Sequence, residues 1–374
     1  METKTVKTLI GFLLLLPASL VCAAGPQAGV TSRPYGQCSE GPVQLHTLTN
    51  AGGLSVSIMD YGATVVNVVT PDRNGNPQDI ALGFDDPGAY AAAALNFGTM
   101  GRYINRIGQA QITLDGHVYP LTENKPPNTM HGGKLGFNRH LWKAEVVSND
   151  PPSVRFSRLS PDGEEGFPGN LNVSVTFTLT NDNHWTVHYN ATTDKPTVVN
   201  LSNHTLFNLS GPGHGTILDD VATVNADGIT PIDATSVPTG EIRKVDGTPY
   251  DLRKPTVLAT RINDLGTKPP GYDINYVLNK EGSSPFSKAG EVYDPKSGRD
   301  LQIFTDQPGA QFYTGNLFDG TLIGKGGVKY TQYCAFSLEA QHFPDSPHHP
   351  NFPSTVVRPG ETYQATIEYI FTTR

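Results

Sequence analysis

Long runs in which apolar and polar residues alternate are the feature that most restricts the fold of this chain. The clearest run covers residues 171–179, and similar runs cover 185–190 and 363–371. Successive side chains of a β-strand point to opposite faces of a sheet, so each run predicts a strand with one buried and one solvated face. Only residues 90–96, which include four consecutive alanines, favour a helix, and that helix would be short.

Turn-forming residues separate these runs. Gly and Pro number 39 and 30 of 374 residues, above the usual share of about 12% for the two together. Asp115 and Gly116 separate two short apolar segments and predict a hairpin, because both residues tolerate the positive φ angles of a type I′ turn. Asn and Asp at 181–183 predict another turn. Many short strands joined in this way predict an all-β fold, either a β-sandwich or a barrel.

The chain shows no repeat at a fixed period and no change of composition typical of an interdomain linker. We therefore expect one large β domain over residues 40–374, preceded by a loosely held N-terminal tail over residues 25–39.

Residues 1–24 resemble a signal peptide. Two lysines precede an apolar stretch over 9–21, and small residues follow at 22–25. The stretch is shorter than the about 20 residues that a transmembrane helix needs. Cys22 would suit a lipoprotein, but the bulky residues before it disfavour that interpretation. We expect an exported protein, periplasmic or extracellular, without a membrane span. The remaining cysteines, Cys38 and Cys334, could form one disulfide in an oxidising compartment, and their spacing does not decide whether they meet. Cys334 lies in an apolar segment, which favours a free, packed thiol.

Charge and missing motifs exclude several functions. The net charge of −8 argues against a nucleic-acid partner. No Gly-rich phosphate loop, no serine-hydrolase elbow and no zinc-protease motif occurs. His342, His348 and His349 lie in a Pro-rich stretch whose spacing does not bring them to one metal. We expect neither a metal nor a cofactor.

Two polar residues in apolar strands are candidates for chemistry. In the segment 200–209, alternation places His204 on the same face as Asn200 and Ser202. In the segment 333–341, it places Glu339 opposite the apolar face. A buried carboxylate is costly unless it is paired or used. An outward-facing Glu on a sandwich would show the same pattern, and a lone His is more often structural.

Further polar segments contain Asn, Asp, Gln, His or Arg beside Tyr or Phe. They are 101–107 (Gly-Arg-Tyr-Ile-Asn-Arg-Ile), 128–133 (Asn-Thr-Met-His-Gly-Gly), 271–276 (Gly-Tyr-Asp-Ile-Asn-Tyr) and 311–316 (Gln-Phe-Tyr-Thr-Gly-Asn). Planar polar groups beside aromatic rings suit a neutral polyhydroxyl ligand, because each hydroxyl both donates and accepts a hydrogen bond. A phosphorylated sugar would require more cationic groups.

Taken in order, these segments resemble the aldose 1-epimerase family. The match includes the four segments above and three more, 162–169 (Asp-Gly-Glu-Glu-Gly-Phe-Pro-Gly), 203–209 (Asn-His-Thr-Leu-Phe-Asn-Leu) and 338–347 (Leu-Glu-Ala-Gln-His-Phe-Pro-Asp-Ser-Pro). The resemblance covers about residues 40–372. It implies a large antiparallel β-sandwich, called a supersandwich, that interconverts the α and β anomers of free hexoses such as glucose and galactose without a cofactor.

The resemblance also implies roles for single residues. Glu339 matches the general base and His204 the general acid. Five residues match positions that hold sugar hydroxyls, namely Asn105, Arg106, His131, Asp273 and Gln311. Leu206 stands where the family commonly has Tyr or Phe, and Ile274 where it commonly has His. We expect these two departures to affect sugar preference, and we expect a monomer or weak dimer that binds a free aldose.

Opening of the sugar ring requires two proton transfers, which Glu339 and His204 would perform. An ionised Glu339 would take the proton of the C1 hydroxyl while a protonated His204 supplies one to the ring oxygen. Three alternatives stay open at this stage: a non-catalytic carbohydrate-binding protein, an epimerase for a hexose phosphate, and a glycoside hydrolase that draws a second carboxylate from residues 162–165.

Overall fold

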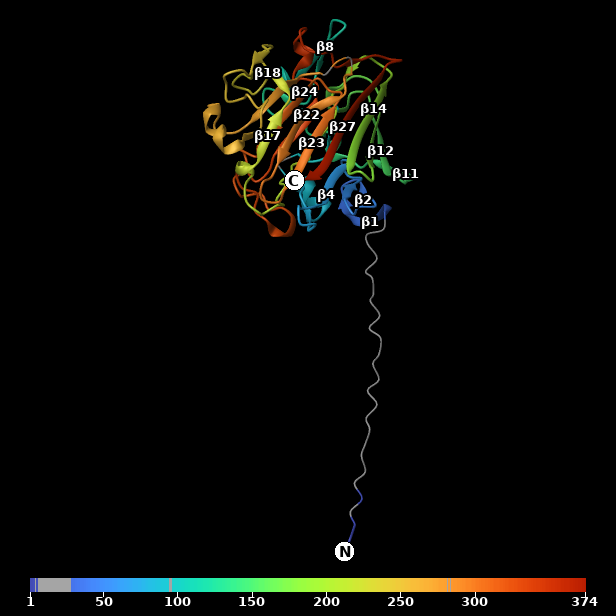
Figure 1. Cartoon of the computed structure of the whole chain (residues 1–374). Coiled ribbons are helices and arrows are strands. Elements are labelled where there is room, and N and C mark those ends of the chain that lie inside the picture. Colours follow the sequence, from blue (N-terminus) through green and yellow to red (C-terminus); the bar gives the residue numbers. More distant parts are fainter. Residues whose placement is uncertain (4, 6–27, 94–95, 281, 283) are drawn as a thin grey trace.

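The computed structural model describes residues 1–3, 5, 28–93, 96–280, 282 and 284–374, and Figure 1 shows the chain. The predicted leader over residues 1–24 thus lies almost wholly outside the described residues. The regular secondary structure of the described residues is nearly all strand, and every strand pair is antiparallel except for an isolated bridge between Tyr103 and Asn200.

The largest sheet has nine strands. Its order is β11 (Lys143–Asn149), β12 (Pro152–Ser160), β13 (Leu171–Leu179), β14 (His184–Thr193), β27 (Thr362–Thr373), β23 (Arg299–Thr305), β22 (Ser287–Tyr293), β17 (Val221–Val224) and β20 (Thr256–Val257). In Figure 1 the C-terminal strand β27 runs through the middle of this sheet, between β14 and β23. The three alternating runs of the sequence became β13, β14 and β27, with their apolar residues buried as predicted.

Two five-stranded sheets accompany it. The first has the order β1 (Gly29–Cys38), β2 (Gly41–Thr49), β3 (Ser55–Met59), β4 (Thr64–Pro71) and β5 (Pro77–Asp79). The second has the order β19 (Arg243–Lys244), β18 (Ala226–Thr230), β21 (Asp273–Leu278), β24 (Gly309–Tyr313) and β25 (Ser337–Gln341). One hydrophobic cluster contains buried residues of all three large sheets, so they share a core. The predicted all-β sandwich is therefore confirmed.

Short ribbons and turns complete the chain. The ribbons pair β6 (Thr99–Met100) with β16 (Ser202–Asn203), β7 (Arg106–Ile107) with β10 (Thr129–Met130), β8 (Gln111–Leu114) with β9 (His117–Pro120), and β15 (Thr197–Val198) with β26 (Val356–Val357). The β8–β9 hairpin turns at Asp115 and Gly116, whose φ angles of 50° and 82° fit the predicted turn. Short 3₁₀ turns lie at Gly108–Ala110, Phe137–Arg139, Glu164–Gly166, Ile217–Asp219, Leu258–Thr260, Ile262–Leu265, Lys325–Gly327 and Ser346–His348.

The helix α1 covers Pro87–Ala92, so it begins three residues before the segment that its alanines predicted. Asp86 caps it by accepting a hydrogen bond from the backbone N–H of Ala89, and Pro87 occupies the first turn. The capping residue and the proline, rather than the alanine run, set where the helix begins.

The N-terminal tail expected over residues 25–39 is corrected from Gly29 onward. Strand β1 pairs with β2 from Gly29 opposite Thr49 to Cys38 opposite Gly41, so this segment is part of the folded domain. Most residues of β1 are exposed or half-buried on both faces. The strand consequently carries no apolar alternation from which it could be predicted.

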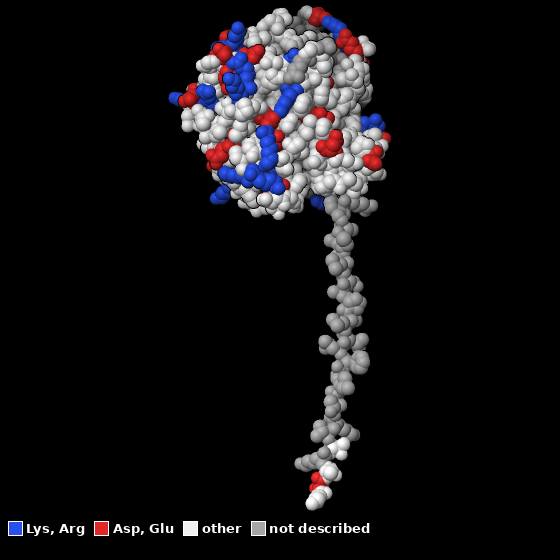
Figure 2. Space-filling model, viewed as in Figure 1, with Lys and Arg blue, Asp and Glu red and all other residues white. Residues whose placement is uncertain are grey.

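The cysteines and the surface complete the description of the fold. Cys38 and Cys334 are both free, and Cys334 is buried, as the sequence favoured. On the face shown in Figure 2, basic and acidic side chains are intermixed. Among the described residues, no helix is long and apolar enough to cross a membrane.

Candidate active site

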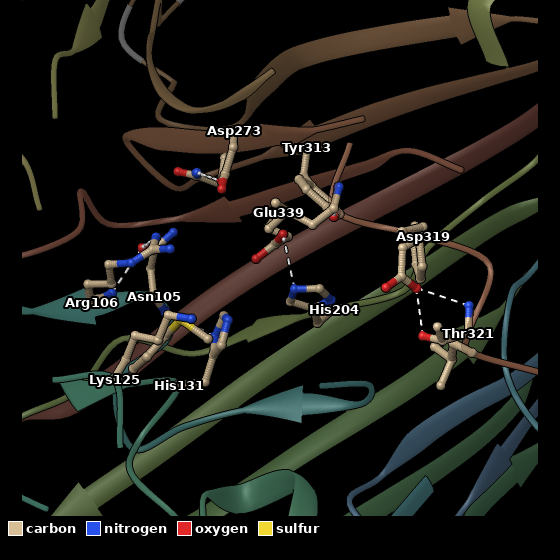
Figure 3. A pocket seen from close by; sticks show the side chains of 15 residues that line it. Asn105, Arg106, Lys125, His131, His204, Asp273, Tyr313, Asp319, Thr321 and Glu339 are labelled. Atoms are coloured by element: carbon tan, nitrogen blue, oxygen red, sulfur yellow. Dashed lines mark hydrogen bonds and ion pairs between the residues drawn. The ribbon is translucent and has the colours of Figure 1, made fainter. Parts of the chain in front are cut away.

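A cavity of about 370 Å³ collects the polar residues that the sequence singled out. All seven predicted site residues line it, and Figure 3 shows most of them from close by. The lining consists of Asn105, Arg106, Lys125, Met130, His131, His204, Asp273, Gln311, Tyr313, Leu317, Phe318, Asp319, Thr321, Leu322 and Glu339. Residues separated by more than 230 positions in the chain therefore meet at one site.

Strand register brings four of these residues together on neighbouring strands. Gln311 of β24 lies directly opposite Glu339 of β25, and Asp273 of β21 lies opposite Tyr313 of β24. Because side chains two apart on a strand share a face, these residues project from one face of the sheet. The amide of Gln311 donates a hydrogen bond of 2.7 Å to Oδ1 of Asp273. That bond holds the amide and the carboxylate in a fixed relation beside Glu339.

Glu339 and His204 face each other across the cavity. Nε2 of His204 lies 3.4 Å from Oε1 of Glu339, and the two residues are only 6% and 2% exposed. Their other polar atoms, Nδ1 of His204 and Oε2 of Glu339, have no hydrogen-bond partner among the described residues. The sequence pattern was also compatible with an exposed Glu339 on the outer face of a sandwich, and its burial excludes that alternative.

Burial shifts both groups away from their charged forms, because each charge would lose its hydration. It raises the pKa of Glu339 to about 8; the charge of Asp273 adds to this rise, while Ser337 and Arg106 oppose it. Burial lowers the pKa of His204 to about 4. Between these values the pair holds one proton, on the Glu339 carboxyl. The sequence hypothesis placed the same single proton on His204.

A short ribbon supplies the opposite wall. Asn105 and His131 both adopt left-handed backbone angles, with φ of 63° and 52°. The N–H of His131 donates to the carbonyl of Asn105 at 2.9 Å, and the N–H of Asn105 donates to Nδ1 of His131 at 3.3 Å. Since Nδ1 accepts, the ring is neutral with its proton on Nε2. Burial, aided by the charges of His204 and Arg106, also lowers the pKa of His131 well below its usual value.

Close packing fixes the turn that carries His131. A Cβ added at Gly132, whose φ is 84°, would lie 1.9 Å from the carbonyl oxygen of Gly101. Only glycine fits this position, which explains the Gly after His131 in the sequence. The ring of His131 meets the ring of His204 edge to face, with centroids 5.2 Å apart.

The two arginines of segment 101–107 have different tasks. Arg106 lines the cavity, and its backbone N–H donates to Oδ1 of Asn105 at 2.9 Å. Arg102 is 2% exposed and donates to the carbonyls of Pro168 and Gly169 at 2.8 and 2.9 Å. Arg102 is therefore a structural residue that joins distant loops.

The two departures from the family pattern do not line the cavity. Leu206 and Ile274 are both buried in hydrophobic clusters. Any effect of these residues on sugar preference would have to pass through packing. The acidic segment 162–165 is also structural, since Glu164 pairs with Arg158 at 2.6 Å and Glu165 accepts from the backbone of residues 134 and 135.

Several lining residues were not singled out individually in the sequence. Met130 and Tyr313 lie in the segments 128–133 and 311–316, but Lys125 and five residues between 317 and 322 lie outside every segment that was singled out. The segment 317–322 is a loop without periodicity or a recognisable motif. His342, His348 and His349 lie outside the cavity, and the described residues contain no group of three His, Cys, Asp or Glu side chains suited to a metal.

Comparison with known proteins gives a consistent result. The family model for aldose 1-epimerase matches residues 44–370. Galactose mutarotase of Bos taurus is 43% identical over 319 residues, which cover 85% of this chain and 91% of that protein. Aldose 1-epimerase of Escherichia coli (strain K12) is 35% identical over 335 residues, covering 88% and 95%.

A solved structure of an aldose epimerase homologue has the same fold. The crystal structure of an aldose epimerase homologue from C. elegans superposes with a TM-score of 0.80 at 32% identity, over 87% of this chain and 98% of that one. The fold, the family model and the relatives all confirm the resemblance found in the sequence, and the chain belongs to the aldose 1-epimerase family.

Proposed function

We propose that this protein interconverts the α and β anomers of free aldohexoses of the glucose and galactose type, with Glu339 and His204 as the acid–base pair. The observation that carries the proposal is the 3.4 Å contact between these two side chains inside a polar cavity. Relatives named galactose mutarotase and aldose 1-epimerase, similar over most of their length, support the same activity.

Anomer exchange requires the pyranose ring to open. A proton leaves the C1 hydroxyl as another reaches the ring oxygen, the C1–O5 bond breaks, and the resulting aldehyde rotates about C1–C2 before the ring closes on its other face. One base and one acid are sufficient, and each is typically worth about 10²–10⁴-fold in rate. Glu339 takes the C1 proton and His204 protonates the ring oxygen; the roles reverse on closure.

The proton must therefore move from the Glu339 carboxyl to His204 when a sugar binds. The two atoms that exchange it, Oε1 and Nε2, are already 3.4 Å apart. The charge of Arg106 lowers the pKa of Glu339 and so favours the ionised carboxylate. Attraction between the carboxylate and the imidazolium favours the same state, because both side chains are buried.

The remaining polar residues hold the sugar. Asn105, Arg106 and the Nε2–H of His131 project from one side, and the bonded pair of Asp273 and Gln311 projects from another. Together they offer donors and acceptors for the C2, C3 and C4 hydroxyls, and holding these hydroxyls keeps C1 and O5 at the pair.

The cavity favours an uncharged sugar over a phosphorylated one. Its cationic residues, Arg106 and Lys125, are balanced by the carboxylates of Asp273 and Asp319. A phosphate placed here would meet negative as well as positive charge. This balance supports free hexoses as the substrates.

Two rival functions make different use of the same cavity. A carbohydrate-binding protein without activity would not require two buried titratable groups in contact, and that contact favours catalysis. A glycoside hydrolase usually needs two carboxylates. Residues 162–165 lie outside the cavity. Of the other carboxylates that line it, Asp273 accepts from the Gln311 amide and Asp319 accepts from the backbone N–H and hydroxyl of Thr321.

Polarimetry tests the proposal. Freshly dissolved α-glucose and α-galactose should reach their equilibrium rotation faster with the enzyme, in proportion to its concentration, and the final rotation should not change. A rotation that relaxes no faster than in buffer would contradict the proposal. Release of reducing sugar from an oligosaccharide would instead support a hydrolase.

A further inference from the structure

Arg106 lies on a strand that is too short to hold itself in place. Strand β7 consists of Arg106 and Ile107, and it pairs with the equally short β10 at Thr129 and Met130. A two-stranded ribbon is only marginally stable by itself. The position of Arg106 in the cavity therefore depends on contacts to the other edge of β7.

Asp345 makes such contacts on both sides of Ile107. Its backbone N–H donates to the carbonyl of Arg106 at 2.9 Å, and its Oδ1 accepts from the backbone N–H of Gly108 at 2.8 Å. A strand directs the C=O of one residue and the N–H of the residue two positions on to the same edge. Asp345 is 3% exposed and does not line the cavity, so it can affect a bound sugar only through the residues it holds.

Two histidines contact the carboxylate of Asp345. Nδ1 of His348 lies 2.6 Å from its Oδ1, and Nε2 of His349 lies 3.3 Å from its Oδ2. The hydrogen bond to Asp345 raises the pKa of His348, so the pair favours an imidazolium beside an ionised carboxylate. A buried carboxylate with partners on both oxygens is held in one orientation.

The loop that carries Asp345 continues directly from β25, the strand of Glu339. The hydroxyl of Tyr103 fastens this loop, because it donates to the carbonyl of Phe343 at 3.1 Å and accepts from the N–H of Ser346 at 3.1 Å. Tyr103 lies shortly before β7 in the chain. The loop thus connects the strand of Glu339 to the strand that bears Arg106.

We propose that Asp345 is a positioning residue, which holds Arg106 where the sugar hydroxyls bind and in a fixed relation to Glu339. This inference rests on the proposed function, which assigns Arg106 to the sugar. Hydroxyls are held in the ground state and in the transition state alike, so a displaced Arg106 raises KM more than it lowers kcat. A residue that only stabilised the fold would change neither constant of the folded enzyme.

Polarimetry at varied glucose concentrations gives kcat and KM of Asp345→Ala, which lacks the acceptor for Gly108. We expect KM to rise about 3–10-fold, the effect of one lost hydrogen bond, and kcat to stay within about twofold. Asp345→Asn keeps an acceptor oxygen and tolerates the φ angle of 58°, so its KM should stay within about twofold of the wild type. If Asp345→Ala does not fold, Asp345→Gly, which also accepts this angle, takes its place.

Asp60→Ala is the matched control. Asp60 is 7% exposed, donates its N–H to the carbonyl of Gln44 at 3.1 Å and accepts the N–H of Gln44 at 3.0 Å, yet neither residue lines the cavity. Urea denaturation should show a loss of stability for Asp60→Ala as for Asp345→Ala. Its KM should equal that of the wild type.

A double variant shows whether Asp345 acts through Arg106. In the Arg106→Met background, Asp345→Ala should lower kcat/KM by no more than about twofold further. An unchanged KM in Asp345→Ala, an equally raised KM in Asp345→Asn, or losses that multiply in the double variant would each overturn the positioning role and leave the anomerase function intact. A wild type that does not accelerate the change of rotation would overturn the anomerase function itself.

Discussion

Nε2 of His204 lies 3.4 Å from Oε1 of Glu339, although His204 follows β16, Glu339 lies in β25 of another sheet, and the two residues are 135 positions apart. Burial makes the carboxyl a weaker acid and the imidazolium a stronger one. The consequence is a pair that keeps one proton across the whole neutral range. A single proton is what ring opening requires, because one partner must give a proton while the other accepts one.

The pH dependence of kcat/KM follows from this proton count. Activity should be flat between about pH 4 and pH 8, the pKa values of His204 and Glu339. Above the upper value the pair loses its proton and with it the acid; below the lower value it gains a second and loses the base. Polarimetry of glucose across this range, corrected for the buffer reaction, provides the check. A single transition near pH 6.5, the ordinary value for histidine, would argue against the coupled pair.

Glu339 should also make stability depend on pH. Folding raises its pKa to about 8. Its contribution to stability is therefore fully present below the unfolded pKa near 4.5 and is lost as the pH rises through about 8. Glu339→Gln does not titrate, so its free energy of unfolding relative to the wild type should rise by on the order of 3 kcal/mol between pH 5 and pH 9. Urea denaturation measures this difference.

Glu123→Gln is the matched control for that measurement, because Glu123 is exposed. It should track the wild type at every pH. A constant difference between wild type and Glu339→Gln would mean that Glu339 is not buried as described.

Variants of Arg102 and Arg106 test whether the first residue stabilises the fold and the second positions the sugar. Arg102→Met leaves the buried carbonyls of Pro168 and Gly169 without their donor and should lower the free energy of unfolding by about 3 kcal/mol or more. Arg106→Met should change stability by about 1 kcal/mol at most but lower kcat/KM by roughly 10-fold or more, because sugar positioning is lost. Urea denaturation and polarimetry on both variants separate the two effects. Equal losses of stability would contradict the assignment.

Local patterns predicted those parts of the fold that depend on local physics. Alternation located β13, β14 and β27, because each buries one face and solvates the other. It missed β1, whose two faces are both largely open, so that its pairing with β2 is not marked by any apolar alternation. It also placed Cys334 in a strand, whereas the strand begins at Ser337 and Cys334 lies in the buried turn before it.

The site could be assembled from sequence only through the family resemblance. Patterning left Glu339 equally compatible with an exposed surface residue, because its burial depends on strands distant in the chain. Spacing also could not distinguish Arg102 from Arg106, since the carbonyls that bind Arg102 lie 66 and 67 residues away. The wall at 317–322 was not predicted at all, because neither periodicity nor a motif marks a turn that closes a cavity.

The rate of anomer exchange by Glu339→Gln and His204→Asn tests the central claim most directly. Both variants replace a titrating group by one of similar shape and should fold with the circular dichroism of the wild type. Polarimetry of fresh α-galactose should show that each loses about 10²-fold or more in kcat, and that the double variant loses little more than either single one, because the two groups act as a unit. A folded single variant that relaxes the rotation as fast as the wild type would contradict the account.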